Sequence, residues 1–268
     1  MKNNVNILIE KAEVRWLKLL DDHGNLAYSK KFLPSHDASH SRRVWEYGKN
    51  ILTRISKNNT LIDLSLVEGL LISAYFHDLG MALTRKADHG QASRQLCENF
   101  FSEKDLCKPD NFEEILRAIE LHDLKTNDYR EEIPLNKRPG LLSLLNISDD
   151  LDAFGIIGIY RYAEIYLLRG TGIRNVGINV LENVGARYNN FARVCFPFPD
   201  LINAHRKRYI EIISFYDNYN QQLVIESSPE TEHSGPVGVV NFIRKFSINQ
   251  KIHPVDYTEF LPASEITK

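Results

Sequence analysis

Cysteine is scarce in this sequence, and the few cysteines are too scattered to organise a fold. The 268 residues include only Cys97, Cys107 and Cys195, an odd number without paired spacing. Neither a cysteine-based zinc site nor a framework of disulfides can therefore hold the chain together. We expect these thiols to be reduced and structural, because a free cysteine usually behaves as a small buried hydrophobic residue.

Long apolar runs and a surplus of one charge are also absent. The longest uncharged apolar stretch, Gly69–Phe76, is far shorter than the roughly 20 residues that span a bilayer. The first residues lead into a charged amphipathic pattern, without the apolar block of a signal peptide. Lys and Arg number 33 against 35 Asp and Glu, which gives a formal net charge of -2. We therefore expect a cytoplasmic protein without membrane attachment, and we do not expect it to bind nucleic acid.

What the sequence does contain is helical periodicity, since apolar residues recur at steps of three and four along most of it. The expected helices are Val5–Leu20, a stretch with His40 in its first turn that ends at Ile55, Ser65–Gly80, Gln91–Phe101, Phe112–His122, Leu141–Asp152, Ile156–Leu168 and Leu201–Leu223. A polar turn is expected at Asp21–Asn25, and Ser65 with Glu68 three residues later predicts a capping box. Val237–Ile248 is compatible with a helix or a short strand.

These patterns predict an all-α fold. No internal repeat and no low-complexity linker divides the chain, so we expect a single domain over residues 1–268. The helix at residues 5–20 stands at its amino-terminal end. Beyond Gly170 the helical pattern weakens until Leu201.

Histidines and aspartates fall near the ends of several expected helices. His77 and Asp78 stand side by side at the end of the most apolar helix, where burying an imidazole and a carboxylate is costly unless something pairs with both. A divalent metal ion would pair with both, since neutral imidazole and ionised carboxylate are the ligands of Zn, Mn, Fe and similar ions. The candidate metal ligands are His40, His77, Asp78, His89, His122 and Asp149.

Single residues of this set also fit structural roles. A lone histidine at a helix end, such as His89 or His122, is often a cap or a hydrogen-bonded core group. Asp152 lies three residues after Asp149, so both could approach a metal from one helix face. Asp152 could equally cap the turn at Gly155 or pair with an arginine, and we favour Asp149 as the ligand.

Three segments resemble the motifs of one family. His36–Val44 places a histidine ahead of an Arg-Val pair, Phe76–Gly80 contains a His-Asp doublet, and Ser148–Gly155 has an aspartate followed by Leu-Asp-Ala and Gly. In this order they resemble the HD-domain superfamily of metal-dependent phosphohydrolases, over about residues 31–170. The resemblance implies a helical bundle as the core. Residues 171–268 lie outside the resemblance, and we expect them to form a carboxy-terminal helical elaboration.

The resemblance also implies a ligand set. It assigns one metal to His40, His77, Asp78 and Asp149, and His89 and His122 match the positions where dinuclear members hold a second ion. Mononuclear members use such positions to hold phosphate, so the number of bound ions, one or two, stays open. The candidate metals are Mn, Fe, Zn, Co and Ni. Asp78 would bridge the ions and orient a metal-activated water for attack on phosphorus.

The implied substrate is a nucleotide or another phosphorylated small molecule. Met81 stands where members that hydrolyse nucleoside monophosphates or guanosine polyphosphate alarmones have a glutamate, which weakens those two specificities. The Gly-Tyr-Pro extension of cyclic di-GMP phosphodiesterases is absent as well. The closing motif most resembles bacterial HD hydrolases of unassigned substrate.

A phosphorylated substrate calls for cationic groups, because charge develops on the phosphoryl oxygens. We expect Arg161 to take a catalytic part, and Arg43, Lys86 and Lys125 to bind the substrate phosphate, because all four lie near a motif. His36 is a candidate general acid, or a partner that supports a metal ligand.

Two other functions stay open. A few members of the superfamily use the same ligand set to hold two irons that activate oxygen, and a non-catalytic regulator could carry a structural metal. A complete ligand set argues against the regulator, because a scaffold does not need open metal positions. A homo-oligomer is compatible with the sequence, which does not decide the oligomeric state.

Overall fold

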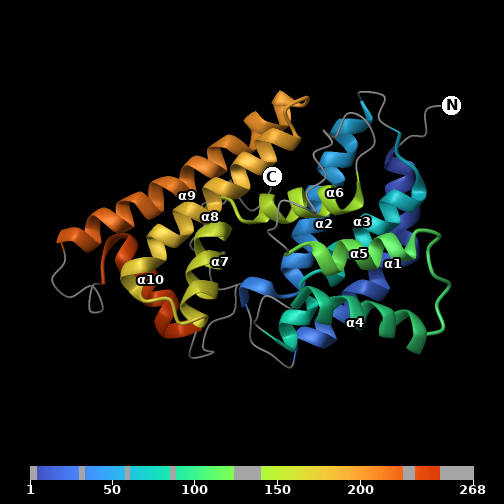
Figure 1. Cartoon of the computed structure of the whole chain (residues 1–268), viewed down its shortest axis with the longest axis horizontal. Coiled ribbons are helices and arrows are strands. Elements are labelled where there is room, and N and C mark those ends of the chain that lie inside the picture. Colours follow the sequence, from blue (N-terminus) through green and yellow to red (C-terminus); the bar gives the residue numbers. More distant parts are fainter. Residues whose placement is uncertain are drawn as a thin grey trace. The chain divides into compact units, whose positions relative to one another are not determined.

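A computed structural model of the chain describes residues 5–29, 34–57, 61–84, 89–123, 140–225 and 233–247, and these residues are helical without any strand (Figure 1). The expected all-α fold class is confirmed. The helices are α1 (Val5–Tyr28), η1 (Pro34–His36), α2 (Ala38–Ser56), α3 (Leu64–Phe76), η2 (Leu79–Ala82), α4 (His89–Glu103), α5 (Phe112–Leu121), α6 (Leu141–Asp152), α7 (Gly155–Leu168), α8 (Ile173–Val194), α9 (Pro199–Ile225) and α10 (Gly235–Ser247), where η marks a short 3₁₀ helix.

The contacts within the chain group its residues into two compact units. The first unit holds α1 to α6 together with residues 186–207. The second holds the described residues of 32–35, 153–185 and 208–268, and in it α7 packs against α10. The single domain over residues 1–268 and its core at 31–170 stay predictions.

Helix α3 is the centre of the first unit. It contacts α1, α2, α4, α5 and α6, and every residue from Val67 to Phe76 is buried. A helix that is apolar on all sides gains most when it is surrounded, because each fully buried large apolar side chain contributes about 1.5–3 kcal/mol. The carboxyl end of α3, and the residues that follow it, are thereby fixed among the surrounding helices.

The start of α3 differs from the expected capping box. Asp63 is the N-cap, and its side chain accepts a hydrogen bond from the Leu66 amide at 2.8 Å. Glu68 is buried and pairs with Arg15 at 3.1 Å, so its carboxylate is not available to the helix start. The prediction of a Ser65–Glu68 box was wrong, because the pairing of α1 with α3 engages Glu68 instead.

The lengths of two helices also differ from expectation. The predicted polar turn at Asp21–Asn25 was wrong, since α1 continues to Tyr28 with Leu20, Gly24 and Tyr28 buried at four-residue spacing. Helix α3 ends at Phe76 rather than Gly80, and the chain turns through His77 and Asp78 into η2. The ambiguous segment at Val237–Ile248 is helical and forms most of α10.

Helix α8 occupies a region where the sequence pattern looked weak. Its buried apolar residues do follow helical spacing, but asparagines and glycines lie between them. The buried apolar residues of α8 are Ile173, Val176, Val180, Val184, Phe191 and Val194.

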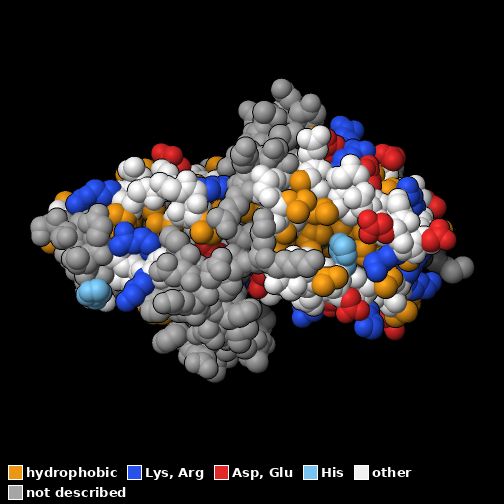
Figure 2. All heavy atoms as spheres, turned by 90° about the horizontal axis from the view of Figure 1, so that it is seen from below, with side chains coloured by type: hydrophobic (Ala, Val, Ile, Leu, Met, Phe, Trp, Pro, Cys, Tyr) orange, Lys and Arg blue, Asp and Glu red, His pale blue; other side chains and the backbone are white. Residues whose placement is uncertain are grey.

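The surface and the thiols fit the composition. Basic and acidic side chains lie interspersed toward the right of the view in Figure 2. Cys97 and Cys195 are buried free thiols, whereas Cys107 is exposed. None of the described helices is both long and apolar enough to cross a bilayer.

Candidate metal centre

The His77–Asp78 doublet lies at the turn that follows α3. His77 is fully buried and its Nδ1 donates to the Ala74 carbonyl oxygen at 3.0 Å. Asp78 is also buried, with 8% of its side chain exposed. The doublet is therefore placed inside the first unit by the packing of α3.

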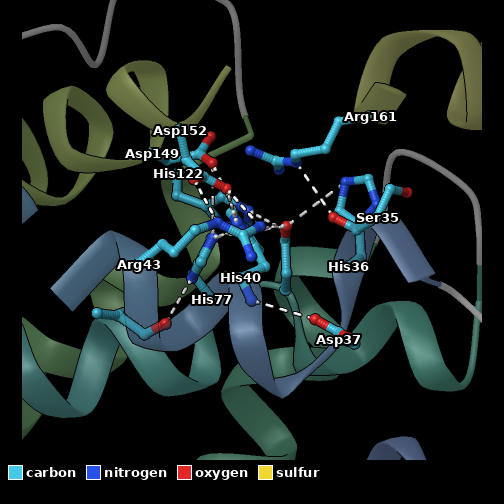
Figure 3. Close-up of polar contacts among 12 residues, drawn as sticks. Ser35, His36, Asp37, His40, Arg43, His77, His122, Asp149, Asp152 and Arg161 are labelled. Carbon is cyan, nitrogen blue, oxygen red and sulfur yellow. Dashed lines mark hydrogen bonds and ion pairs between the residues drawn. The ribbon is translucent and has the colours of Figure 1, made fainter. Parts of the chain in front are cut away.

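One group of candidate ligands gathers around Asp78 Oδ2. The Nε2 atoms of His40, from the first turn of α2, and of His77 lie 3.2 and 3.5 Å from this oxygen and 3.2 Å from each other. Asp149 from α6 completes the group, with its Oδ1 3.5 Å from His40 Nε2 (Figure 3). The packing of α2 against α6 brings His40 and Asp149 together.

A second group gathers around the other oxygen of Asp78. His89, the first residue of α4, places Nε2 3.2 Å from Asp78 Oδ1, and His122, which caps the carboxyl end of α5, places Nε2 at 3.1 Å. The two imidazole nitrogens are 3.2 Å apart. The packing of α4 against α5 brings these two helix ends together.

The outer nitrogen of each ring is engaged by an oxygen. His122 Nδ1 donates to the Ile119 carbonyl oxygen at 2.7 Å, as His77 Nδ1 does to Ala74. His40 Nδ1 lies 2.8 Å from Asp152, and His89 Nδ1 lies 3.4 Å from Asp123. A neutral ring that donates through Nδ1 carries its lone pair on Nε2, so these partners assign the tautomers. Four nitrogen lone pairs and carboxylate oxygens therefore point at one another.

The charge states of the doublet suit metal binding. Burial is the main cause that lowers the pKa of His77, to about 4, so the ring is neutral at pH 7. Burial raises the pKa of Asp78, but its imidazole neighbours, His77 first, hold it well below its usual range. A neutral imidazole and an ionised carboxylate are the forms that bind a divalent ion.

The donor set fits a metal. Lone pairs that face one another repel unless a cation lies between them, and atoms bonded to one ion at about 2.1 Å are themselves about 3–3.5 Å apart. The ligand atoms of His40, His77, Asp78 and Asp149 all lie within 4.8 Å of one another, as do those of Asp78, His89 and His122. The six residues predicted from the sequence are therefore brought together in two groups that share Asp78, and each group could hold an ion.

A comparison with protein families agrees with this geometry. A family model described as HD-CE matches residues 20–165, which is more than half of the chain and includes all six candidate ligands. The chain belongs to the HD-CE family. No curated protein and no solved structure was found to match it.

Asp152 supports the metal centre through the outer ring nitrogen of His40. It accepts from His40 Nδ1 through Oδ2, and it accepts from Arg43 Nε at 2.7 Å and Nη2 at 3.0 Å. Arg43 Nη1 donates to the Ser39 hydroxyl at 2.8 Å. Of the alternatives for Asp152, pairing with an arginine is the one observed, while Asp149 is the carboxylate that faces the other ligands.

Of the four residues expected to act on the substrate phosphate, Arg43 and Arg161 lie among the described residues. Arg43 directs its guanidinium to Asp152 and Ser39, and Lys86 and Lys125 lie outside the described residues. Arg161 belongs to the second unit, where its Nε donates to the Ser35 carbonyl oxygen at 3.1 Å. Roles for these four residues in substrate binding or catalysis stay predictions.

Three further residues lie next to candidate ligands of the metal centre. His36 Nε2 is 3.8 Å from Asp78 Oδ2, and its ring meets that of His40 edge to face. Asp123 stands behind His89, and Arg187 from α8 contacts Asp149. The last two were not predicted from the sequence. Asp123 repeats the His-Asp doublet directly after His122, a signal that the sequence contains, whereas nothing local marks Arg187.

Proposed function

We propose that this HD-CE protein is a metal-dependent phosphohydrolase or phosphodiesterase whose centre holds two divalent ions. The observation that carries the proposal is that the two carboxylate oxygens of Asp78 face different groups of ligands. Its Oδ2 faces His40 and His77, and its Oδ1 faces His89 and His122. A carboxylate that serves two groups of ligands through its two oxygens is typical of a dinuclear site.

The number of ligands leaves room for chemistry. The first group offers four ligand atoms and the second offers three, with Asp78 counted in both. Catalytic metal sites keep a position open for water or substrate. Three ligands leave such a position around a tetrahedral ion, and four leave one around an ion that takes six ligands. Bound ions would lower the pKa of a water ligand to about 7 and would neutralise charge on the phosphoryl oxygens.

The residues of the chain orient and desolvate this centre. Outer partners hold all four imidazoles in one tautomer, which fixes the direction of each Nε2. The low pKa of Asp78 keeps its carboxylate ionised at neutral pH, so it can bind a cation and accept hydrogen bonds there. The substrate class that this proposal assigns is a nucleotide or another small phosphate ester.

Metal content and ester hydrolysis test the proposal together. Protein loaded with Mn²⁺ and freed of excess metal is subjected to elemental analysis and assayed with p-nitrophenyl phosphate and bis(p-nitrophenyl) phosphate. Wild type should retain two ions, Asp78→Ala close to none and His122→Ala one. Hydrolysis of at least one ester should be lost in Asp78→Ala. His233→Ala is the matched control, because this exposed histidine lies outside both groups.

Two outcomes contradict the proposal. Wild type that cannot be loaded with any divalent metal would leave a non-catalytic role for the chain. Protein that is isolated with iron, consumes oxygen and hydrolyses neither ester would be an oxygenase built on the same six ligands.

A further inference from the structure

Arg187 contacts the metal centre from a helix that the family match does not include. It lies on α8, beyond residue 165, and its Nη1 donates to Asp149 Oδ2 at 2.8 Å. The same nitrogen lies 2.8 Å from Asp150 Oδ1. The side chain of Arg187 is 27% exposed, so the contact is partly shielded from water.

Adjacent carboxylates on one helix require such a cation. The side chains of Asp149 and Asp150 are only 14% and 11% exposed, and two buried like charges repel strongly. The guanidinium contacts an oxygen of each and offsets that repulsion. Asn190, one turn after Arg187 on α8, donates to the other oxygen of Asp150 at 3.3 Å. Asp150 is thus held from α8 on both of its oxygens.

The contact with Arg187 determines which oxygen of Asp149 faces the ligands. A carboxylate turns freely about its bond to the β-carbon unless one of its oxygens is held. Arg187 holds Oδ2, and Oδ1 then lies 3.5 Å from His40 Nε2 and 3.9 Å from His77 Nε2. A hydrogen bond to the outer oxygen of a carboxylate ligand orients it and raises the metal affinity of the site.

We propose that Arg187 is a positioning residue of the metal centre, which orients Asp149 for the ion of the first group and makes α8 part of that centre. The inference rests on the metal binding in the proposed function, and it does not depend on the reaction that the metal serves. Residues 20–165 contain every candidate ligand but not the group that orients Asp149. The metal centre of this chain therefore extends beyond the segment that its family shares.

Titration of the metal-free full-length chain with Co²⁺ tests the inference, since the visible absorption of Co²⁺ reports its coordination. Arg187→Gln should weaken the binding of one ion about tenfold or more, the loss typical when a hydrogen-bond partner of a metal ligand is removed. Arg187→Lys should recover part of the affinity, because it keeps the charge but loses the planar guanidinium. Arg174→Gln, an exposed arginine on the same helix, should bind as wild type does.

A second titration identifies the group that is affected. In a His122→Ala background the first group is the intact one, and Arg187→Gln should produce the same loss there. Thermal unfolding of the metal-free variants separates positioning from folding. A positioning role predicts weaker binding of one ion beyond any loss of stability from the unpaired Asp149 and Asp150, whereas a purely structural role predicts equal loss of both ions with a lower melting temperature.

Three results overturn the inference. The inference is wrong if Arg187→Gln binds two Co²⁺ ions with wild-type affinity, and it is also wrong if this variant loses both ions equally. If the Gln variant does not fold, Arg187→Lys carries the test, and full wild-type affinity in that variant overturns the inference. Failure of wild type itself to bind Co²⁺ removes the proposed function as well, which distinguishes the two failures.

Discussion

Asp152 supports the first group of ligands without being one of them. It is fully buried and accepts hydrogen bonds from His40 and, in bidentate fashion, from Arg43. Bidentate pairs between arginine and carboxylate are among the stronger polar contacts in proteins, because two parallel bonds fix the geometry. Asp152 therefore fixes the ring of His40 only while Arg43 holds it.

Removal of Arg43 should be costly for stability. We expect Arg43→Met to lower the free energy of unfolding of the metal-free protein by about 3–5 kcal/mol, because Asp152 would keep a buried charge without its arginine. Arg42→Met is the matched control. Arg42 pairs with Asp21 at 2.8 Å, but its side chain is 56% exposed, and exposed pairs contribute about 0–1 kcal/mol.

Urea unfolding of the two variants measures this difference. A loss at Arg43 no larger than the loss at Arg42 would contradict the assigned role, since burial would then make no difference to the pair. A large loss at Arg43 alone would support a structural role for this arginine beside the histidine motif.

Residue chemistry made the ligands predictable from the sequence, and packing made their supports unpredictable. His77 beside Asp78 on an apolar helix was enough to imply a metal, because little else pairs with both groups inside a core. The partner of Asp152 depended on how α2 meets α6, a contact between residues more than a hundred positions apart. Arg187 depended in the same way on where α8 lies.

At the scale of elements, the close approach of η2 to α4 places His89. A methyl group on Gly80 would lie 2.2 Å from the His89 carbonyl oxygen and 2.8 Å from the Ser93 amide nitrogen. The Gly80 amide donates to the Ser93 hydroxyl at 2.8 Å, which joins the two elements. Only glycine allows this approach, so Gly80 sets the position of the second group relative to Asp78.

Gly80→Ala should therefore affect the second ion more than the first. We expect α4 to shift at His89, with one ion bound more weakly and a loss of about 1–3 kcal/mol from overpacking. Gly24→Ala is the control, because its methyl group would meet only Ala38 Cβ at 3.9 Å. Removing a glycine from the interior of α1 should stabilise the protein by up to about 1 kcal/mol. Calorimetric metal titration and urea unfolding check both variants, and unchanged binding of two ions in Gly80→Ala would refute the expectation.

Helices with a continuous apolar stripe were predictable, and α8 shows where this signal fails. The stripe of α8 is intact, but its residues alternate with asparagines and glycines, which have low helix propensity. Burial of the stripe decides the structure, and burial is not visible in local sequence. The same limit explains the missed end of α1, where a glycine and polar residues concealed the spacing of Leu20, Gly24 and Tyr28.

At the scale of the whole molecule, the half-buried His23 and the buried His77 link stability to pH. Burial lowers the pKa of His23, and the nearby Lys104 lowers it further. The ring packs against Phe76 and Phe100, and its Nε2 has no hydrogen-bond partner among the described residues. His77 shifts in the same direction for the same main reason. The unfolded chain regains the ordinary histidine pKa of about 6.5 and takes up protons first as the pH falls.

Stability should therefore fall as the pH drops below about 6.5, because proton uptake favours the unfolded chain, with at most about 1.4 kcal/mol per pH unit for each histidine. His23→Leu removes one of these contributions and leaves that of His77 in place. As the pH falls from 6.5 to 5, we expect the free energy of unfolding of the variant to rise relative to that of wild type. From pH 7.5 to pH 8.5 the difference between the two free energies should stay constant. Urea unfolding of both metal-free proteins across this range measures the difference. A gap that does not change with pH would mean that the His23 ring titrates alike in the folded and unfolded chain, and the acid sensitivity would then have to arise at the metal centre.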